Sequence, residues 1–206
     1  MTHHTWIAPF TCVISGPTGS GKSVFVQRLI QHARAVISPP PERILYCYGS
    51  YQEAFSKIEG VEFKEGLPSP NEFDGGKHSL VIIDDLMHET NTVVSKLFTK
   101  GSHHTNTSVV YITQNLFNQN KEMRNIALNT QYLVLFKNVC DKSQITYLAR
   151  QMYPSSPKHM VEAYTDATDE PYSYLFVDLK PNIDEKHRLK SCIFPDDEYN
   201  YVYVPK

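Results

Sequence analysis

A phosphate-binding loop near the N-terminus constrains the fold of this chain more than any other feature. Residues 16–23 read GPTGSGKS, a full match to the pattern GxxxxGK followed by Ser or Thr. The motif requires a strand before it and a helix after it. Both are expected here, because residues 11–15 are rich in β-branched side chains and Val26, Leu29 and Ile30 have helical spacing. The context therefore predicts a nucleoside triphosphate site rather than a chance glycine-rich turn.

The residue types in this loop have distinct expected roles. Glycines let the backbone curl so that successive N–H groups point inward, and the N-terminus of the following helix adds partial positive charge to the anion site. Lys22 is expected to reach the β- and γ-phosphates, and Ser23 to hold Mg²⁺. ATP and Mg²⁺ are the expected cofactors. The predicted nucleotide-binding residues are Gly16, Pro17, Thr18, Gly19, Ser20, Gly21, Lys22 and Ser23.

The composition fits one globular domain without a global basic field. The chain has 206 residues, 41% of them apolar, and a formal net charge of −2. Contacts to nucleic acid would therefore have to be local or assembled from several copies. The cysteines are scattered without zinc-ligand spacing, and the chain lacks an apolar run of about 18 residues. We expect a soluble protein of a reducing, intracellular compartment, without zinc and without a membrane partner.

Strand-like apolar runs recur along the chain, with helical or loop stretches between the early ones. The runs cover residues 11–15, 44–48, 80–84, 108–113, 132–137 and 174–179. This alternation is typical of an α/β fold with a central, mostly parallel sheet flanked by helices. We assign residues 1–180 to a P-loop ATPase domain and residues 181–206 to a C-terminal extension. The extension is expected to be an added strand or a docking segment.

A second half of the site is expected where residues 80–85 read LVIIDD, an apolar strand ending in two carboxylates. The strand-like run at residues 44–48 lies between the phosphate loop and these acids, which indicates the extra-strand, RecA-like (ASCE) division of P-loop NTPases, typical of motors and helicases. We expect Asp84 to bind Mg²⁺ and Asp85 to polarise the attacking water. Because many relatives have the longer Glu at the second position, Glu89 is the alternative base.

Residues 108–115 read SVVYITQN, a further strand that ends in amides. If the sheet places this strand between the other two, Gln114 would contact the γ-phosphate or water and report whether the phosphate is present. The alternative is a pair of amides that cap a loop.

Phosphoryl transfer also gains from an arginine supplied by a neighbouring subunit. Arg124 is the first candidate and Arg150 the second, with an ordinary surface role as the alternative for either.

For several other aromatic and basic side chains, an ordinary structural role is the alternative to a functional one. Trp6 and Phe10, just before the first strand, could flank the base, although packing against the sheet is the commoner fate of such residues. Arg28, in the helix behind the loop, is expected to face solvent. His103 and His104 lack further ligands at metal spacing, so a polar turn or a DNA-facing loop is expected there.

The order of the motifs carries a family resemblance. After the phosphate loop, the chain reads IIDDLM (82–87), LFTKGSHH (97–104), YITQNLF (111–117), LFKN (135–138) and LARQMYP (148–154). Over roughly residues 8–155 it closely resembles the poxvirus-type viral DNA-packaging ATPases, in the Polinton, Maverick and adintovirus branch of the FtsK-HerA superfamily. The resemblance implies a ring, expected to be a hexamer, that hydrolyses ATP between subunits and pumps double-stranded DNA into a preformed capsid.

The resemblance also implies partners, a location and a catalytic set. Double-stranded DNA and capsid proteins are the expected partners, in the host nucleus, a cytoplasmic virus factory or the virion. Loops repeated around a channel need few DNA contacts each. The candidates for these contacts are Lys100, His103, His104 and Lys121. The implied catalytic residues are Lys22, Asp84, Asp85, Gln114 and Arg124, with Ser23 and Asp84 at the metal.

Alternative functions differ in what they require of the sequence. A nucleotide kinase would need an arginine-rich lid, and a GTPase would need a DxxG motif after the acids, whereas Asp84 is followed by Asp-Leu-Met. A helicase or another P-loop ATPase stays open. A non-enzymatic alternative is a nucleotide-gated assembly module whose ATP stays bound and sets subunit contacts, which Asp85 in place of Glu keeps open.

Overall fold

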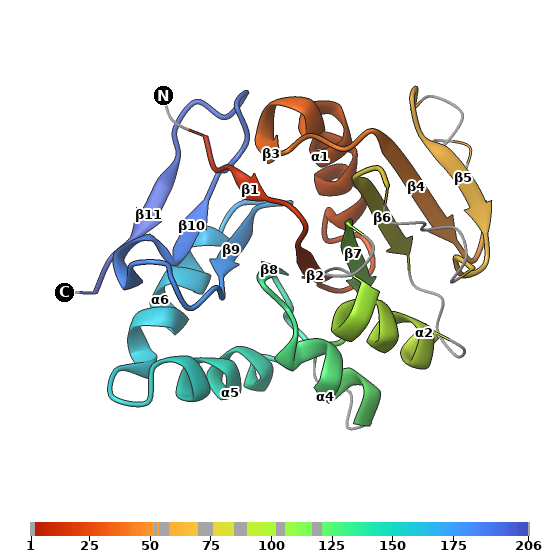
Figure 1. Cartoon of the computed structure of the whole chain (residues 1–206). Coiled ribbons are helices and arrows are strands. Elements are labelled where there is room, and N and C mark those ends of the chain that lie inside the picture. Colours follow the sequence, from red (N-terminus) through yellow and green to blue (C-terminus); the bar gives the residue numbers. More distant parts are fainter. Residues whose placement is uncertain are drawn as a thin grey trace.

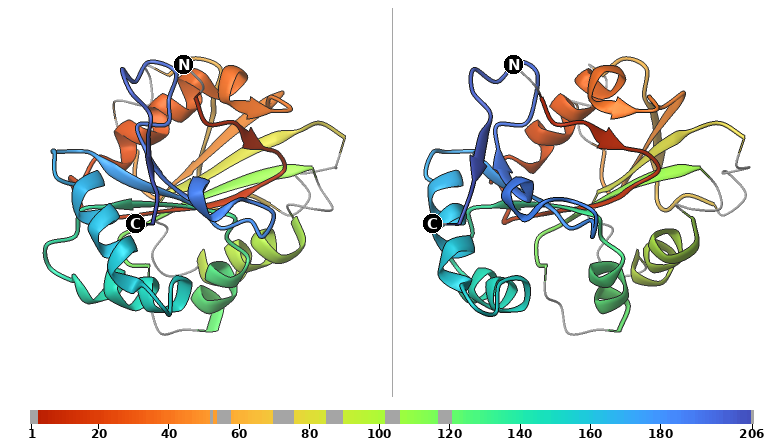
Figure 2. Two further views of the ribbon diagram at one scale, coloured as in Figure 1. Left: turned by 90° about the vertical axis from the view of Figure 1, so that its left-hand side faces the viewer. Right: turned by 60° about the vertical axis from the view of Figure 1, so that its left-hand side comes forward.

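The computed structural model of the chain has a central sheet with helices on both of its faces (Figure 1). It describes residues 3–51, 53, 58–69, 76–84, 90–101, 106–116 and 121–205. In the two views of Figure 2, the first helix lies on one side of the sheet and the helices of the second half of the chain lie on the other. The described part is therefore a three-layer α/β arrangement.

The sheet has nine described strands in the order β11-β10-β9-β8-β2-β7-β6-β4-β5. The pairs from β8 to β5 are parallel, and β9, β10 and β11 continue the sheet antiparallel beyond β8. The strands are β2 (Thr11–Ser15), β4 (Arg43–Tyr48), β5 (Glu62–Glu65), β6 (Ser79–Asp84), β7 (Thr107–Thr113), β8 (Tyr132–Phe136), β9 (Tyr174–Asp178), β10 (Leu189–Ser191) and β11 (Tyr201–Tyr203). All six strands expected from the sequence are present, each within one residue of the predicted bounds.

Helices connect most of these strands, and a small second sheet flanks them. The helices are α1 (Lys22–Val36), α2 (Thr90–Lys96) with the π-helical η3 (Leu97–Gly101), α4 (Lys121–Leu128), α5 (Ser143–Met152), α6 (Pro157–Ala167) and the 3₁₀ turn η4 (Glu185–His187). The small sheet pairs β1 (Trp6–Ile7) with β3 (Ile37–Ser38) in parallel. The mostly parallel α/β fold predicted from the sequence is confirmed.

Alternate residues of the central strands face opposite helical layers. Cys12 and Ile14 of β2 belong to one buried cluster with Phe25 and Leu29 of α1, whereas Val13 belongs to the cluster formed with the helices on the other face. Period-two alternation with apolar residues on both sides is what a parallel strand covered on both faces requires. The central strands are therefore fixed in register by two cores at once.

The C-terminal residues add the strands β10 and β11 to this sheet, and they also cover α1. Arg28 of α1 donates to Asp196 at 2.6 Å and to Asp197 at 2.9 Å, and its guanidinium lies 4.5 Å from the centre of the Phe194 ring. Phe194 is buried and its ring centre lies 5.1 Å from that of Phe25. The expectation that Arg28 faces solvent is wrong, because the tail folds back over α1 and partners it.

Candidate nucleotide-binding site

The strand order brings three polar strand ends together. β7 lies between β2 and β6, with Ser15 opposite Thr113 and Ile112 opposite Asp84. Because the three strands are parallel, their carboxyl ends meet at one edge of the sheet, where ligands bind in open α/β sheets. The condition set for Gln114, that its strand lies between the other two, is met.

The backbone of the phosphate loop has the conformations that the motif predicts. Gly19 and Gly21 have positive φ angles of 76° and 109°, which residues with a Cβ atom rarely adopt. Gly21 is also the residue that caps α1, so the helix begins at Lys22. The first-turn N–H groups of α1 and the loop amides therefore meet at one place, as an anion site requires.

The loop is packed so closely against β8 that its first glycine cannot carry a side chain. A Cβ atom on Gly16 would lie 2.6 Å from Cβ of Phe136 and 2.7 Å from Oγ of Ser20. The Gly16 N–H donates to the carbonyl oxygen of Thr113 at 3.3 Å, which joins the loop to the end of β7. Ser20 Oγ is itself buried and makes no hydrogen bond with the described residues. The loop is thus held in place before any ligand arrives.

The Lys22 side chain folds over this loop. Its Nζ donates to the carbonyl oxygens of Gly16 at 2.6 Å and of Pro17 at 2.9 Å. Both acceptors are neutral, so an anionic phosphate is the stronger partner for the ammonium group. The ammonium group is therefore held beside the first two residues of the loop, and its expected contact with the β- and γ-phosphates stays a prediction.

Asp84, the last residue of β6, is held by a hydroxyl from the next strand. Tyr46 of β4 donates from its hydroxyl to Oδ2 of Asp84 at 2.7 Å. Burial of the phenol, and then the nearby carboxylate, raise the pKa of Tyr46, so this hydroxyl stays protonated and donates. Sequence reasoning missed Tyr46, because only the register of β4 against β6 places it beside the acid.

The amides after β7 contact the start of α5. Gln144 Nε2 donates to Oδ1 of Asn115 at 2.9 Å and to Oδ2 of Asp141 at 2.8 Å. Hydrogen bonds from Ser143 and then from Gln144 hold the pKa of Asp141 below its ordinary value, so its carboxylate stays ionised. Asp141 and Gln144 were also missed, since nothing in their local sequence links them to a strand end 26 residues or more earlier. Gln114 itself is exposed beside Asn115.

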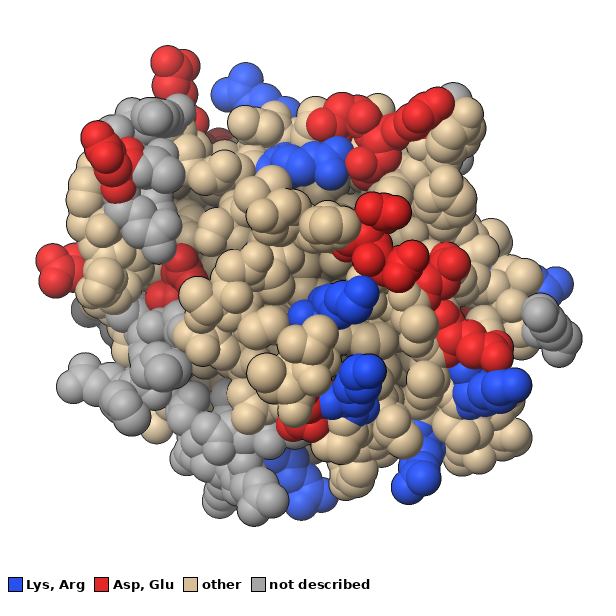
Figure 3. Space-filling model, turned by 180° about the vertical axis from the view of Figure 1, so that it is seen from behind, with Lys and Arg blue, Asp and Glu red and all other residues tan. Residues whose placement is uncertain are grey.

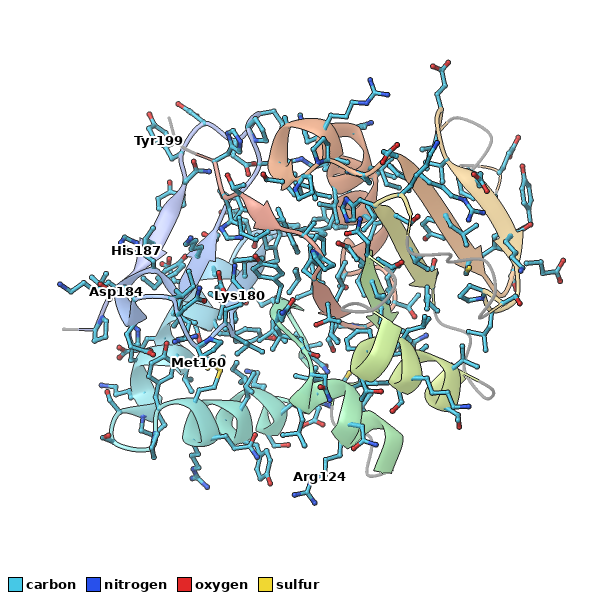
Figure 4. The ribbon with its side chains drawn as sticks, viewed as in Figure 1. Arg124, Met160, Lys180, Asp184, His187 and Tyr199 are labelled. Carbon is cyan, nitrogen blue, oxygen red and sulfur yellow. The ribbon has the colours of Figure 1, made fainter. Side chains whose placement is uncertain are left out.

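The described part of the chain does not place the other predicted residues at this cluster. Asp85 and Glu89 lie outside the described residues, as do His103 and His104. Arg124 is exposed on α4 and points away from the sheet (Figure 4), and Arg150 is exposed on α5. Neither arginine is brought to the phosphate loop of its own chain, so a role for either in a neighbouring subunit stays a prediction.

The aromatic residues before β2 are placed in the core. Trp6 and Phe10 are both 0% exposed, and their ring centres lie 5.0 Å apart. Neither ring can flank a bound base, and of the two expectations for them packing against the sheet is the correct one.

The face seen in Figure 3 is mixed in charge. Acidic side chains form a band there beside scattered lysine and arginine side chains. The side chains of Lys100 and Lys121 lie outside what the structure describes, so the predicted DNA contacts stay predictions. Within the described ranges, no helix is long and apolar enough to cross a membrane.

The residues present fit a nucleoside triphosphate with Mg²⁺. Gly19 has open space where a side chain would stand, Lys22 supplies a cation, and the Ser23 hydroxyl and Asp84 carboxylate are the hard oxygen ligands that Mg²⁺ prefers. No cluster of three or more His, Cys, Asp or Glu exists within the described ranges.

No protein-family model matches the chain, and no curated protein matches it. Among solved structures it is similar to the cytoplasmic domain of the type VII secretion ATPase EccC of Thermomonospora curvata, at 12% identity over 87% of this chain and 26% of that chain, with a TM-score of 0.53. It also matches the cytoplasmic domain of EssC, at 13% identity over 96% of this chain and 40% of that one, with a TM-score of 0.49. A third match is the Legionella pneumophila ATPase DotB, at 13% identity over 79% of this chain and 53% of that one, with a TM-score of 0.41.

The chain spans between 26% and 53% of the length of these structures. At such low identity the likeness bears on the fold alone, and the EccC domain is the comparison that supports it. This chain has an α/β fold similar to that of the EccC cytoplasmic domain.

Proposed function

We propose that this chain binds ATP with Mg²⁺ and hydrolyses it, and that it uses hydrolysis to translocate double-stranded DNA. The observation that carries the proposal is the meeting of three elements at adjacent strand ends: the phosphate loop after β2, Asp84 at the end of β6 with its partner Tyr46 from β4, and the amides after β7. A phosphate loop alone would support nucleotide binding. The acid and the amides beside it supply what hydrolysis needs in addition.

The expected roles follow from the chemistry of phosphoryl transfer. Lys22 and the loop amides bind the phosphates, while Ser23 and Asp84 hold Mg²⁺, which neutralises phosphate charge when bound. Asp85, or Glu89 in its place, orients and deprotonates the attacking water. Gln114 contacts the γ-phosphate. Arg124, or else Arg150, is delivered to the site of a neighbouring subunit in a ring.

DNA as the substrate rests on the resemblance of the motif order to viral packaging ATPases. A ring of six copies would let a weakly charged chain grip duplex DNA, because few contacts from each copy are multiplied around the channel. Lys100, His103, His104 and Lys121 are the proposed contacts. Capsid proteins would be the partners that receive the DNA.

Steady-state hydrolysis with and without long duplex DNA tests this proposal. We expect turnover that DNA stimulates several-fold and that Lys22→Ala abolishes, while the matched surface variant Lys142→Ala keeps it. Since Lys142 is exposed at the start of α5, its loss leaves the phosphate loop intact. If the protein hydrolyses ATP in a Lys22-dependent manner but neither binds DNA nor is stimulated by it, DNA translocation would be contradicted. ATP hydrolysis would still stand.

The second candidate is a nucleotide-gated assembly module. Asp85 in place of the longer Glu favours it, because a shorter carboxylate can leave ATP bound without hydrolysing it. Assembled rings that retain unhydrolysed ATP in a one-to-one ratio with the chain would support the module over the motor.

A further inference from the structure

The connection between α6 and β9 contains a turn with an unusual residue at its third position. The Ser173 N–H and Oγ donate to the carbonyl oxygen of Glu170, at 3.3 Å and 2.6 Å. Pro171 occupies the second position, and Tyr172 occupies the third with a φ of 64°. Pro followed by a positive φ is the arrangement of a type II turn, whose third position strongly favours Gly. A bulky aromatic residue is disfavoured there, so its presence calls for a function of the side chain.

This turn lies directly against the phosphate loop. A Cβ atom on Gly21 would lie 3.0 Å from Cβ of Tyr172 and 3.2 Å from its Cα. Gly21 is the residue that caps the N-terminus of α1, next to Lys22. The tyrosine backbone is therefore in contact with the part of the loop from which the helix N-terminus presents its amides.

The side chain of Tyr172 is available to a ligand. It is 66% exposed, although residues 174–178, which follow it in β9, are buried. In the first turn of α1, Val24 is 53% exposed as well. Both apolar side chains remain in contact with solvent beside the anion site, and neither is used by the phosphate chemistry described above.

Hydrogen bonds fix the connection before this turn to the central sheet. Thr168 Oγ1 donates to the carbonyl oxygen of Tyr164 at 2.7 Å, and the Tyr164 hydroxyl donates to the carbonyl oxygen of Phe136 at 2.9 Å. Lys137 Nζ donates to the carbonyl oxygen of Asp169 at 3.4 Å. These bonds tie the connection before Tyr172 to the end of β8, so the tyrosine is a positioned group.

We propose that the ring of Tyr172 stacks on the base of the nucleotide whose phosphates the loop binds. The proposal rests on the proposed function, because it needs a nucleotide at the loop. A base attached through ribose to phosphates at the start of α1 lies within reach of a side chain whose Cα and Cβ atoms lie against Gly21. Stacking uses the π-face of the base and reads no hydrogen-bond pattern, so Tyr172 adds affinity for the nucleoside part and none for the phosphates.

Binding of ATP and of inorganic tripolyphosphate, each with Mg²⁺ and measured by calorimetry, tests the proposal. Tyr172→Asn removes the ring but accepts the positive φ, and Tyr172→Phe keeps the ring. We expect Tyr172→Asn to weaken ATP binding about tenfold and leave tripolyphosphate binding unchanged. Tyr172→Phe should stay within about twofold of the unaltered chain for both ligands. The exposed Tyr147 of α5 provides the control, since Tyr147→Asn should change neither affinity.

Two results would overturn the inference. Equal weakening of both ligands by Tyr172→Asn would mean that the residue only shapes the phosphate loop. ATP binding that depends on Lys22 but not on Tyr172 would remove the stacking role and keep the proposed function. Failure of the unaltered chain to bind ATP would instead remove the proposed function, and this inference with it.

Discussion

The Tyr46 hydroxyl donates a hydrogen bond of 2.7 Å to Oδ2 of Asp84, across the parallel pair of β4 and β6. The phenol comes from the strand inserted between the phosphate loop and the acid, so the extra strand of this fold contributes a side chain to the site as well as width to the sheet. The bond holds Oδ2 of the carboxylate at the end of β6.

Tyr46→Phe removes this bond and keeps the buried ring. We expect turnover to fall by roughly tenfold, as for loss of one hydrogen bond to a charged group, and more Mg²⁺ to be needed for half-maximal rate. A rate profile against Mg²⁺ measures both. Tyr132→Phe, which removes a buried hydroxyl remote from Asp84, is the control and should keep the rate. An unchanged Mg²⁺ profile in Tyr46→Phe would show that Asp84 needs no such support.

Gly16→Ala should destabilise the fold and prevent nucleotide binding together. Its new methyl group would overlap Phe136, where the closest atom is 2.6 Å away, and overpacking of this kind costs about 1–3 kcal/mol. Gly60→Ala is the matched control, because Gly60 has a φ of 74° with open space around it. In that control the free energy of unfolding should fall by about 1–2 kcal/mol from backbone strain alone, and ATP should bind normally. Chemical denaturation and calorimetry give the two quantities.

Gln144→Leu should separate nucleotide binding from turnover. The Gln144 amide joins Asn115 to Asp141, so its loss leaves the loop after β7 without its link to α5. We expect ATP affinity within about twofold of the unaltered chain and a several-fold lower rate, since a misplaced group lowers the rate more than binding. Single-turnover and binding assays measure these, with Thr146→Ala on the same helix as control. Equal losses in binding and rate would instead indicate general damage to the site.

The stability of the chain should fall in acid through His4. Burial of this ring, and then the charge of Lys190, lower the pKa of His4 from 6.5 to about 3. The folded state therefore binds fewer protons than the unfolded state between these values, and stability present above about pH 6.5 is lost as the pH falls toward 3. His4→Phe should remove a slope of up to about 1.4 kcal/mol per pH unit in that window. Urea unfolding at several pH values measures it, with the exposed His187→Phe as control. An identical slope in His4→Phe would assign the acid lability to other groups.

The sequence predicted the centre of this fold better than its edges. The strands covered on both faces are continuous apolar runs, and periodicity locates them within one residue. β5, which reads EFKE at the edge of the sheet, is charged at three of its four positions and has no such run. β10 and β11 are three residues each, too short for a pattern to emerge. Their pairing depends on β9, which turns the sheet antiparallel.

The same difference applies to the site. The phosphate loop and the end of β6 were predicted, because each is a contiguous motif whose chemistry can be read from neighbouring residues. Tyr46, Gln144 and Tyr172 were not, because each reaches the site only through pairing or packing of distant segments. Trp6 and Phe10 lie near the motif in sequence yet are fully buried, which shows that proximity along the chain does not give access to a ligand.

The contact between Arg28 and the acidic residues of the tail bears on the order in which the protein can be completed during synthesis. β2 pairs with β7 and β8, about a hundred residues later, and α1 is covered by Phe194, Asp196 and Asp197. A chain that emerges N-terminus first makes its phosphate loop early but cannot cover the helix behind that loop until residues 194–197 have left the ribosome. The nucleotide site should therefore mature late, when translation of the described residues is nearly finished.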